Sequence, residues 1–168
     1  ALWAQADEAA LAGLRRDYLG YVLQTGGLLP FLSVRDNIAL PGRIKGVDAR
    51  GDRLERLASR LGVKECLARM PSALSIGQRQ RAAILRALAH GPRLVLADEP
   101  TAAVDKARAR SIIDDMNALA RDETVAVVVV THDVDLLAGR ADRIYGFEVE
   151  QVSAHVTRSL CRRMERLR

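Results

Sequence analysis

Two adjacent carboxylates, Asp98 and Glu99, have the clearest chemical potential in this sequence. They follow the apolar run Leu94–Ala97, so a buried strand would bring both to one end of a sheet. One carboxylate placed there can hold Mg²⁺, and its neighbour can activate a water molecule. About one helix length earlier, Ser75–Gln78 stands where a helix N-terminus would offer free N–H groups to an anion. This pairing predicts chemistry on a phosphate.

Two further polar residues follow predicted strands. Gln24 comes after the strand Tyr18–Leu23, and His132 follows the strand expected over residues 124–131. In open parallel sheets, ligands gather at the carboxyl ends of the strands, so these side chains belong near Asp98 and Glu99. An imidazole can donate a hydrogen bond to phosphate in either protonation state. We therefore add Gln24 and His132 to the candidate site.

Each of these residues also has a plain structural interpretation. Ser75 can be a simple helix N-cap, and Asp105 can cap the helix that follows it. An isolated Asp-Glu pair can be a solvated turn. Leu28, Leu29 and other apolar residues in the loop after Gln24 can be ordinary core anchors. These alternatives remain open from the sequence alone.

The elements that must position the site indicate an α/β fold. Strands and helices alternate after Gly77, with continuous Val and Leu runs that predict a parallel sheet covered on both faces. The interval between Gln24 and Ser75 contains short helical patterns and no comparable strand. We expect residues 1–24 and 76–150 to form the α/β core, residues 25–75 an all-helical insert, and residues 151–168 a helical tail.

The sequence L-S-I-G-Q at 74–78, followed by L-A-D-E-P-T at 96–101, resembles the ATPase subunits of ABC transporters, and the resemblance covers Tyr18 to about Phe147. It implies a P-loop NTPase-like core, with ATP and Mg²⁺ as cofactors. Asp98 would bind the metal as the Walker B aspartate, and Glu99 would be the general base. Gln24 would sense the metal or the attacking water, and His132 would contact the γ-phosphate.

The resemblance also implies partners. Ser75, Gly77 and Gln78 would bind the nucleotide held by a second ATPase subunit, and Asp105 would communicate across that dimer. The loop from Leu28 onward, through Ile38, would receive a coupling helix from an integral membrane subunit. The sequence departs from the family pattern at two places. The family usually has glycine at position 76, and its usual side-chain donors are missing at 102 and 103.

The motifs of this sequence are most like those of the branch for lipoprotein release, macrolide export and cell division.

One expected part is missing from these residues. No segment matches G-x-x-x-x-G-K-[ST], and Lys45 has neither the spacing nor the following Ser or Thr. Family order places this phosphate-binding Walker A segment before Gln24, so we expect an N-terminal lobe upstream of Ala1. The chain alone should then not hydrolyse ATP. A degenerate, regulatory subunit that binds no nucleotide itself is the alternative.

Composition narrows the remaining classes of protein. The 168 residues are 49% hydrophobic and 28% charged, and the longest apolar run, Val125–Val130, is too short to cross a bilayer. We expect a soluble, cytoplasmic protein, and the resemblance implies that it is peripheral on the inner face of the membrane. The net charge of +5 is scattered, and no aromatic residues interleave with the arginines of the tail, so nucleic acid is not an expected partner.

A nucleic-acid-acting ABC ATPase is nevertheless a distinct alternative. Members of the chromosome-organising type carry a long coiled coil between the glutamine loop and the signature. Here 51 positions separate Gln24 from Ser75, with no sustained heptads, which disfavours that class. Cys66 and Cys161 match neither a metal motif nor a redox pair.

Overall fold

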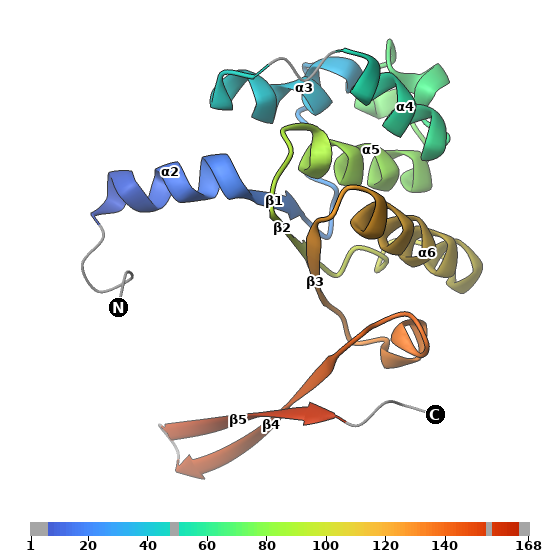
Figure 1. The fold of residues 1–168 in the computed structure, drawn as a ribbon. Coiled ribbons are helices and arrows are strands. Elements are labelled where there is room, and N and C mark those ends of the chain that lie inside the picture. Colours follow the sequence, from blue (N-terminus) through green and yellow to red (C-terminus); the bar gives the residue numbers. More distant parts are fainter. Residues whose placement is uncertain (1–6, 48–50, 154–155, 165–168) are drawn as a thin grey trace. The chain divides into compact units, whose positions relative to one another are not determined.

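The computed structural model describes residues 7–47, 51–153 and 156–164 (Figure 1). The chain divides into two compact units, residues 1–132 and residues 133–168. The elements of the first unit are α2 (Glu8–Tyr18), β1 (Leu19–Val22), α3 (Val34–Lys45), α4 (Asp52–Arg60), the 3₁₀ turns η1 (Lys64–Cys66) and η2 (Pro71–Ala73), α5 (Ile76–Ala89), β2 (Leu94–Asp98), α6 (Lys106–Asp122) and β3 (Ala126–Val130). Those of the second unit are η3 (Val134–Leu137), β4 (Ile144–Ser153) and β5 (Val156–Met164).

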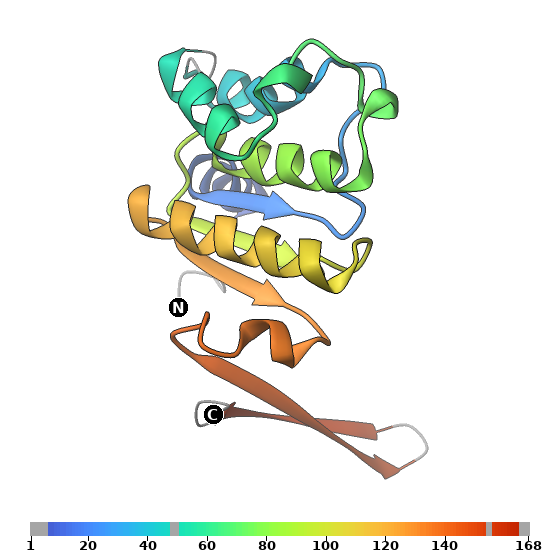
Figure 2. The ribbon, with the colours of Figure 1, turned by 90° about the vertical axis from the view of Figure 1, so that its right-hand side faces the viewer.

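The first unit is built on a three-stranded parallel sheet in the order β1-β2-β3. Its register aligns Val22 with Ala97 and Ala97 with Val129. Figure 2 shows the three arrows pointing the same way, so the carboxyl ends of the strands meet at one edge. The α/β class and the parallel sheet predicted from the sequence are confirmed.

Helices cover only one face of this sheet in the part of the chain that the structure describes. Figure 1 shows α5 and α6 on the same side, where Val22 and Val95 are buried. Two successive crossovers in the same direction place their helices on one face when both are right-handed. On the other face Tyr21 and Val128 are exposed. The prediction of a sheet covered on both faces is therefore wrong for these residues.

The segment between β1 and α5 is helical, and its described residues, 25–47 and 51–75, contain no strand. Helix α3 begins at Ser33, which accepts a hydrogen bond from the Asp36 N–H, and it continues through Pro41 to Lys45. Pro41 removes only one N–H donor and does not end the helix, which ends at Gly46, whose φ of 80° provides the left-handed C-cap.

One hydrophobic core joins the helical segment to the sheet. Its largest fully buried side chains include Ile38 of α3, Leu61 after α4, Leu85 of α5 and Ile112 of α6. Val95 contributes from β2. Burial of such side chains contributes about 1.5–3 kcal/mol each relative to exposure. The helical segment is thus held to the sheet by apolar contact through α5.

Helix α5 and strand β1 lie in unusually close contact at Gly20. A Cβ atom at Gly20 would lie 2.2 Å from the carbonyl oxygen of Ala87. Near the start of the loop after β1, a Cβ at Gly26 would be 3.6 Å from the Cβ of Ala83. Strand β1 and the turn that follows it therefore run antiparallel to α5.

The second unit contains an antiparallel hairpin in place of the predicted helical tail. Strand β5 pairs with β4, Glu150 lies opposite Arg158, and Arg162 pairs with Glu148 at 3.3 Å. The helix predicted over 151–168 is therefore wrong for the described residues, and these cross-strand pairs stabilise the strand pairing in its place. Residues 154–155 and 165–168, which belong to that prediction, lie outside the described residues.

Strand β4 is not one of the three strands of the parallel sheet. In the structure β4 begins at Ile144, extends to Ser153 and forms a separate two-stranded sheet with β5.

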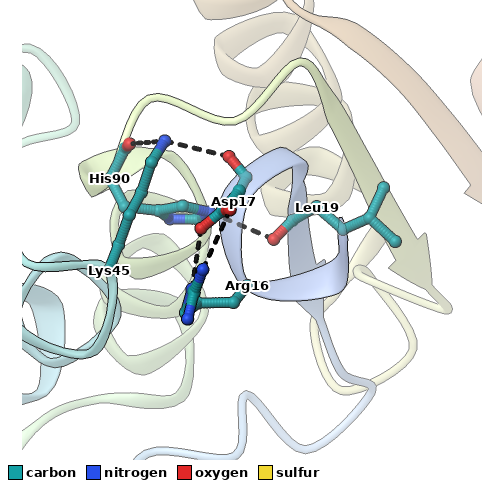
Figure 3. Close-up of polar contacts among 5 residues, drawn as sticks. All are labelled: Arg16, Asp17, Leu19, Lys45 and His90. Carbon is teal, nitrogen blue, oxygen red and sulfur yellow. Dashed lines mark hydrogen bonds and ion pairs between the residues drawn. The ribbon is translucent and has the colours of Figure 1, made fainter. Parts of the chain in front are cut away.

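A cluster of polar contacts closes the C-terminal end of α5 (Figure 3). The Lys45 ammonium donates to the carbonyl oxygens of Asp17 at 2.9 Å and His90 at 3.1 Å. The His90 ring is buried, and its Nε2 lies 3.1 Å from the Leu19 carbonyl oxygen. Arg53 donates to the two preceding carbonyl oxygens of the helix, those of Leu88 and Ala89. Cations at a helix C-terminus are favourable, because the free carbonyls concentrate negative charge there.

The contact at Gly20 predicts a strong effect of one methyl group. Gly20→Ala should destabilise the fold by about 1–3 kcal/mol or more, because the carbonyl of Ala87 is backbone and cannot move aside. Gly13→Ala is the matched control, since nothing lies within 4 Å of its added Cβ and alanine favours a helix. Urea unfolding should show opposite shifts. Equal stability of Gly20→Ala and wild type would contradict the packing described.

The buried imidazole predicts a dependence of stability on pH. Burial lowers the pKa of His90, and the charges of Lys45 and Arg53 act in the same direction. Unfolding restores a pKa of about 6.5, so the unfolded chain binds a proton more readily. The free energy of unfolding should therefore fall as the pH drops through about 6.5. His90→Gln removes this titration, and its amide can still donate a hydrogen bond, so its free energy of unfolding should depend less on pH. An identical pH dependence would contradict the assignment of this effect to His90.

Candidate functional site

The parallel register brings three polar residues to one edge of the sheet. The register aligns Val22, Ala97 and Val129 of the three strands. Two residues beyond these positions the chain has Gln24, Glu99 and Thr131. Gln24 and Glu99 were predicted from the sequence to lie together at this edge, and Thr131 was not recognised. Its place before His132, at the carboxyl end of a strand, is the signal that could have identified it.

Glu99 is held in an unusual backbone conformation. Its φ is 43°, in the left-handed region, and its N–H donates to the Val130 carbonyl at 2.9 Å. The carboxylate accepts the Thr131 hydroxyl at 3.2 Å and the His132 N–H at 2.8 Å. A non-glycine residue in this region costs about 1–3 kcal/mol, and such strain concentrates at functional sites. These three hydrogen bonds offset the strain and fix the carboxylate at the end of β2.

The His132 side chain projects into solvent next to this carboxylate. Its Nε2 lies 3.6 Å from Glu99 Oε1, and the imidazole is fully exposed while the Glu99 side chain is only 17% exposed. The structure thus brings Glu99 and His132 together. The exposed ring is free to meet a ligand that approaches the edge of the sheet.

Asp98 and Gln24, the predicted metal residues, are both exposed beside Glu99. Within the described part of the chain the Asp98 carboxylate has neither an ion pair nor a hydrogen-bond partner. Mg²⁺ is commonly bound by one or two protein oxygens together with phosphate and water. A free carboxylate and an amide oxygen fit such a site, although the described residues contain no cluster of three or more His, Cys, Asp or Glu that could hold a metal alone.

The segment Ser75–Gln78 forms the N-terminus of α5 through a reciprocal capping box. The Ser75 Oγ accepts from the Gln78 N–H at 3.2 Å, and the Gln78 Oε1 accepts from the Ser75 N–H at 3.0 Å. The amide oxygen of Gln78 is therefore engaged within the chain. Ile76 is exposed, and a Cβ at Gly77 would meet nothing within 4 Å. The fold itself gives no steric reason for glycine at 77.

Asp105 is the N-cap of α6, which is the structural interpretation of this residue that the sequence offered. Its carboxylate accepts from the Arg108 N–H at 3.0 Å and pairs with the Arg108 side chain at 3.3 Å. The hydrogen bond from the Arg108 backbone is the main reason that the pKa of Asp105 is lowered. The carboxylate is exposed, so capping leaves its outer side accessible.

The predicted residues therefore fall into separate groups. Glu99 and His132 are in contact, and Asp98 and Gln24 share their edge of the sheet. Within the described ranges no hydrogen bond or ion pair joins Ser75 or Gln78 to that group, and Asp105 contacts Arg108 instead.

The family model described as "ABC transporter" matches residues 5–102, more than half of the chain. The chain belongs to the ABC transporter family. That match contains Gln24, the capping box of α5 and the two carboxylates Asp98 and Glu99 at the end of β2, so the resemblance inferred from the sequence is confirmed.

Curated ABC relatives share up to nearly half of the aligned residues. The macrolide export ATP-binding/permease protein MacB 1 of Aeromonas hydrophila is 46% identical over 137 residues, 80% of this chain and 21% of that protein. The lipoprotein-releasing system ATP-binding protein LolD of Maricaulis maris is 41% identical over 152 residues, 89% of this chain and 66% of that protein. The chain thus spans about a fifth of one relative and just under two thirds of the other.

Two solved ABC structures agree with the fold. A dimeric structure of the cassette MJ0796 is 34% identical with a TM-score of 0.70, covering 82% of this chain and 62% of that one. A dimeric post-hydrolysis state of MJ0796, bound to ADP and Pi, has a TM-score of 0.66 at 34% identity, with 79% and 60% covered. Within the described ranges, no helix is both long and apolar enough to cross a membrane.

Proposed function

We propose that this chain is the larger part of an ATP-binding and ATP-hydrolysing subunit of an ABC transporter, which energises export through a membrane partner. The reaction is in-line attack of water on the γ-phosphate of ATP. Catalysis then rests on positioning and on charge stabilisation, because the protein forms no covalent bond to the phosphate.

The arrangement around Glu99 carries this proposal. A carboxylate held by Thr131 and the His132 backbone can accept a proton from water without having to reorganise. Asp98 and Gln24 supply the oxygens for Mg²⁺, which neutralises charge on the phosphates when bound. His132 donates to the γ-phosphate from its exposed position beside Glu99.

The N-terminus of α5 serves a second nucleotide in this proposal. Ser75 and Gly77 face open space, and free N–H groups at a helix start favour phosphate. We infer that they bind the ATP held by a second copy or a homologous subunit, with Gln78 stabilising the turn and Asp105 facing the same dimer interface. The dimeric state of MJ0796 supports this inference.

The phosphate cradle lies outside these 168 residues in our proposal. Two features of β3 support this. Among the described residues β3 is the end strand of the parallel sheet, and Val128 and Val130 are exposed on its face although its sequence is typical of the buried centre of a sheet. A further parallel strand there would bring a phosphate-binding loop to the edge that holds Glu99. Without that strand the chain should bind and hydrolyse no ATP alone.

The membrane partner is inferred from the relatives. The names of the MacB and LolD proteins refer to macrolide export and lipoprotein release. We propose a subunit of this branch at the cytoplasmic face of the membrane, with the loop after Gln24 receiving the partner. Phe31 in that loop is strongly exposed, which supports a protein contact there.

Replacement of Glu99 tests the proposed reaction. In the complete subunit, Glu99→Gln should lower kcat for ATP hydrolysis by about 100-fold or more, because the amide cannot accept the proton. The affinity for ATP should stay close to that of wild type. Phosphate release and nucleotide binding measure the two quantities.

Glu65→Gln is the matched control, because Glu65 is exposed and has no partner in the described residues. It should leave both quantities unchanged. Normal hydrolysis by Glu99→Gln would sink the assignment of the base. Failure of the complete wild-type subunit to bind ATP would favour the regulatory alternative.

A further inference from the structure

Arg86 is a cation of α5 whose guanidinium binds two backbone oxygens and no carboxylate among the described residues. Its Nη1 donates to the Gly27 carbonyl at 2.5 Å, and its Nη2 donates to the Gly26 carbonyl at 3.0 Å. Within the described residues it has no acidic partner. Burial lowers the pKa of this guanidinium. A half-buried charge of this kind is costly, and its two hydrogen bonds to the turn offset that cost.

The two carbonyls belong to the turn that immediately follows Gln24. Gly26 and Gly27 have φ values of 74° and 59°, and the Gly26 N–H closes the turn on the Leu23 carbonyl at 2.8 Å. Gly26 is buried against α5, and its added Cβ would lie 3.7 Å from the carbonyl oxygen of Arg79. Left-handed glycines thus allow the turn to lie directly on the helix.

A second buried side chain holds the other end of this loop. Asn37 of α3 is completely buried, and its Oδ1 accepts from the Leu29 N–H at 2.7 Å. Its amide group donates to the carbonyls of Leu29, Leu32 and Ser33 at 3.0–3.1 Å. The loop is therefore fixed at both ends, by α5 near Gln24 and by α3 farther along.

We propose that Arg86 is a positioning residue that ties Gln24 to the helix beginning at Ser75. Its planar fork binds two successive carbonyls, and two bonds fix orientation as well as distance. A displacement of α5 on binding phosphate at its N-terminus is then passed to the turn after Gln24. This inference rests on the proposed function, because it gives Ser75 and Gln24 their roles at two nucleotides.

Hydrogen exchange on the complete subunit tests the link without nucleotide or a membrane partner. In Arg86→Met the amides of residues 24–28 should exchange at least about tenfold faster, because two charge-assisted hydrogen bonds are lost. Arg86→Lys, which can keep one bond, should fall between. Arg79→Met is the control on the same helix, since its side chain is exposed and has no partner in the described residues, and it should change nothing.

The amides of α5 should keep wild-type protection in Arg86→Met. Unchanged exchange at 24–28, or equal loosening of the turn and of α5, would overturn the proposal, because Arg86 would then be either unnecessary or only a stabiliser of the whole fold. Arg86→Lys guards against a general loss of folding in the methionine variant.

Kinetics of the complete subunit test the consequence for the reaction. Arg86→Met should lower kcat at least about tenfold while the KM for ATP changes little, since only the placement of Gln24 is disturbed. Wild-type kcat with a loosened turn would contradict the coupling. Normal ATP hydrolysis by Glu99→Gln would contradict the proposed function. The exchange result at residues 24–28 would still test the contact between Arg86 and the turn, because it does not depend on hydrolysis.

Discussion

The close approach of α5 to β1 is the constraint on which the first unit depends. The Ala87 carbonyl lies where a Cβ on residue 20 would be, so only glycine allows the helix this near the sheet. Backbone contact of this kind fixes the helix along the strand more firmly than flexible side chains could. It brings Ala83 beside the turn after Gln24. The carbonyls that follow Ala87, at the C-terminal end of α5, accept hydrogen bonds from Lys45 and Arg53.

The same sheet supplies the chemistry through its register. Parallel pairing places the residues after β1, β2 and β3 at one edge, and Glu99 is held there at a φ of 43°. The strain is local, and the hydrogen bonds to Val130, Thr131 and His132 offset it. In the proposed function, a carboxylate fixed in advance spends little free energy on reorganisation when water attacks.

Sequence patterns predicted what local rules determine. Apolar runs identified the three strands, and N-cap chemistry identified the starts of α5 at Ser75 and α6 at Asp105. Features that depend on distant partners were not predicted. The spacing around Leu160 fits both helix and strand, and the cross-strand pairs with β4 decide it. The run ending at Val130 indicated burial on both faces, yet one face is open. The partners of Arg86 lie 59 and 60 residues away, beyond any local pattern.

In the proposed function each chain contributes to two nucleotide sites, with Glu99 at one and Gly77 at the other. Mixing two inactive complete subunits, Glu99→Gln and Gly77→Asp, tests this arrangement. In a mixed dimer both defects fall on one site, and the other site pairs an intact Glu99 with an intact Gly77. ATP hydrolysis should therefore reappear on mixing. A mixture as inactive as its two parents would contradict it, because both residues would then serve the same site.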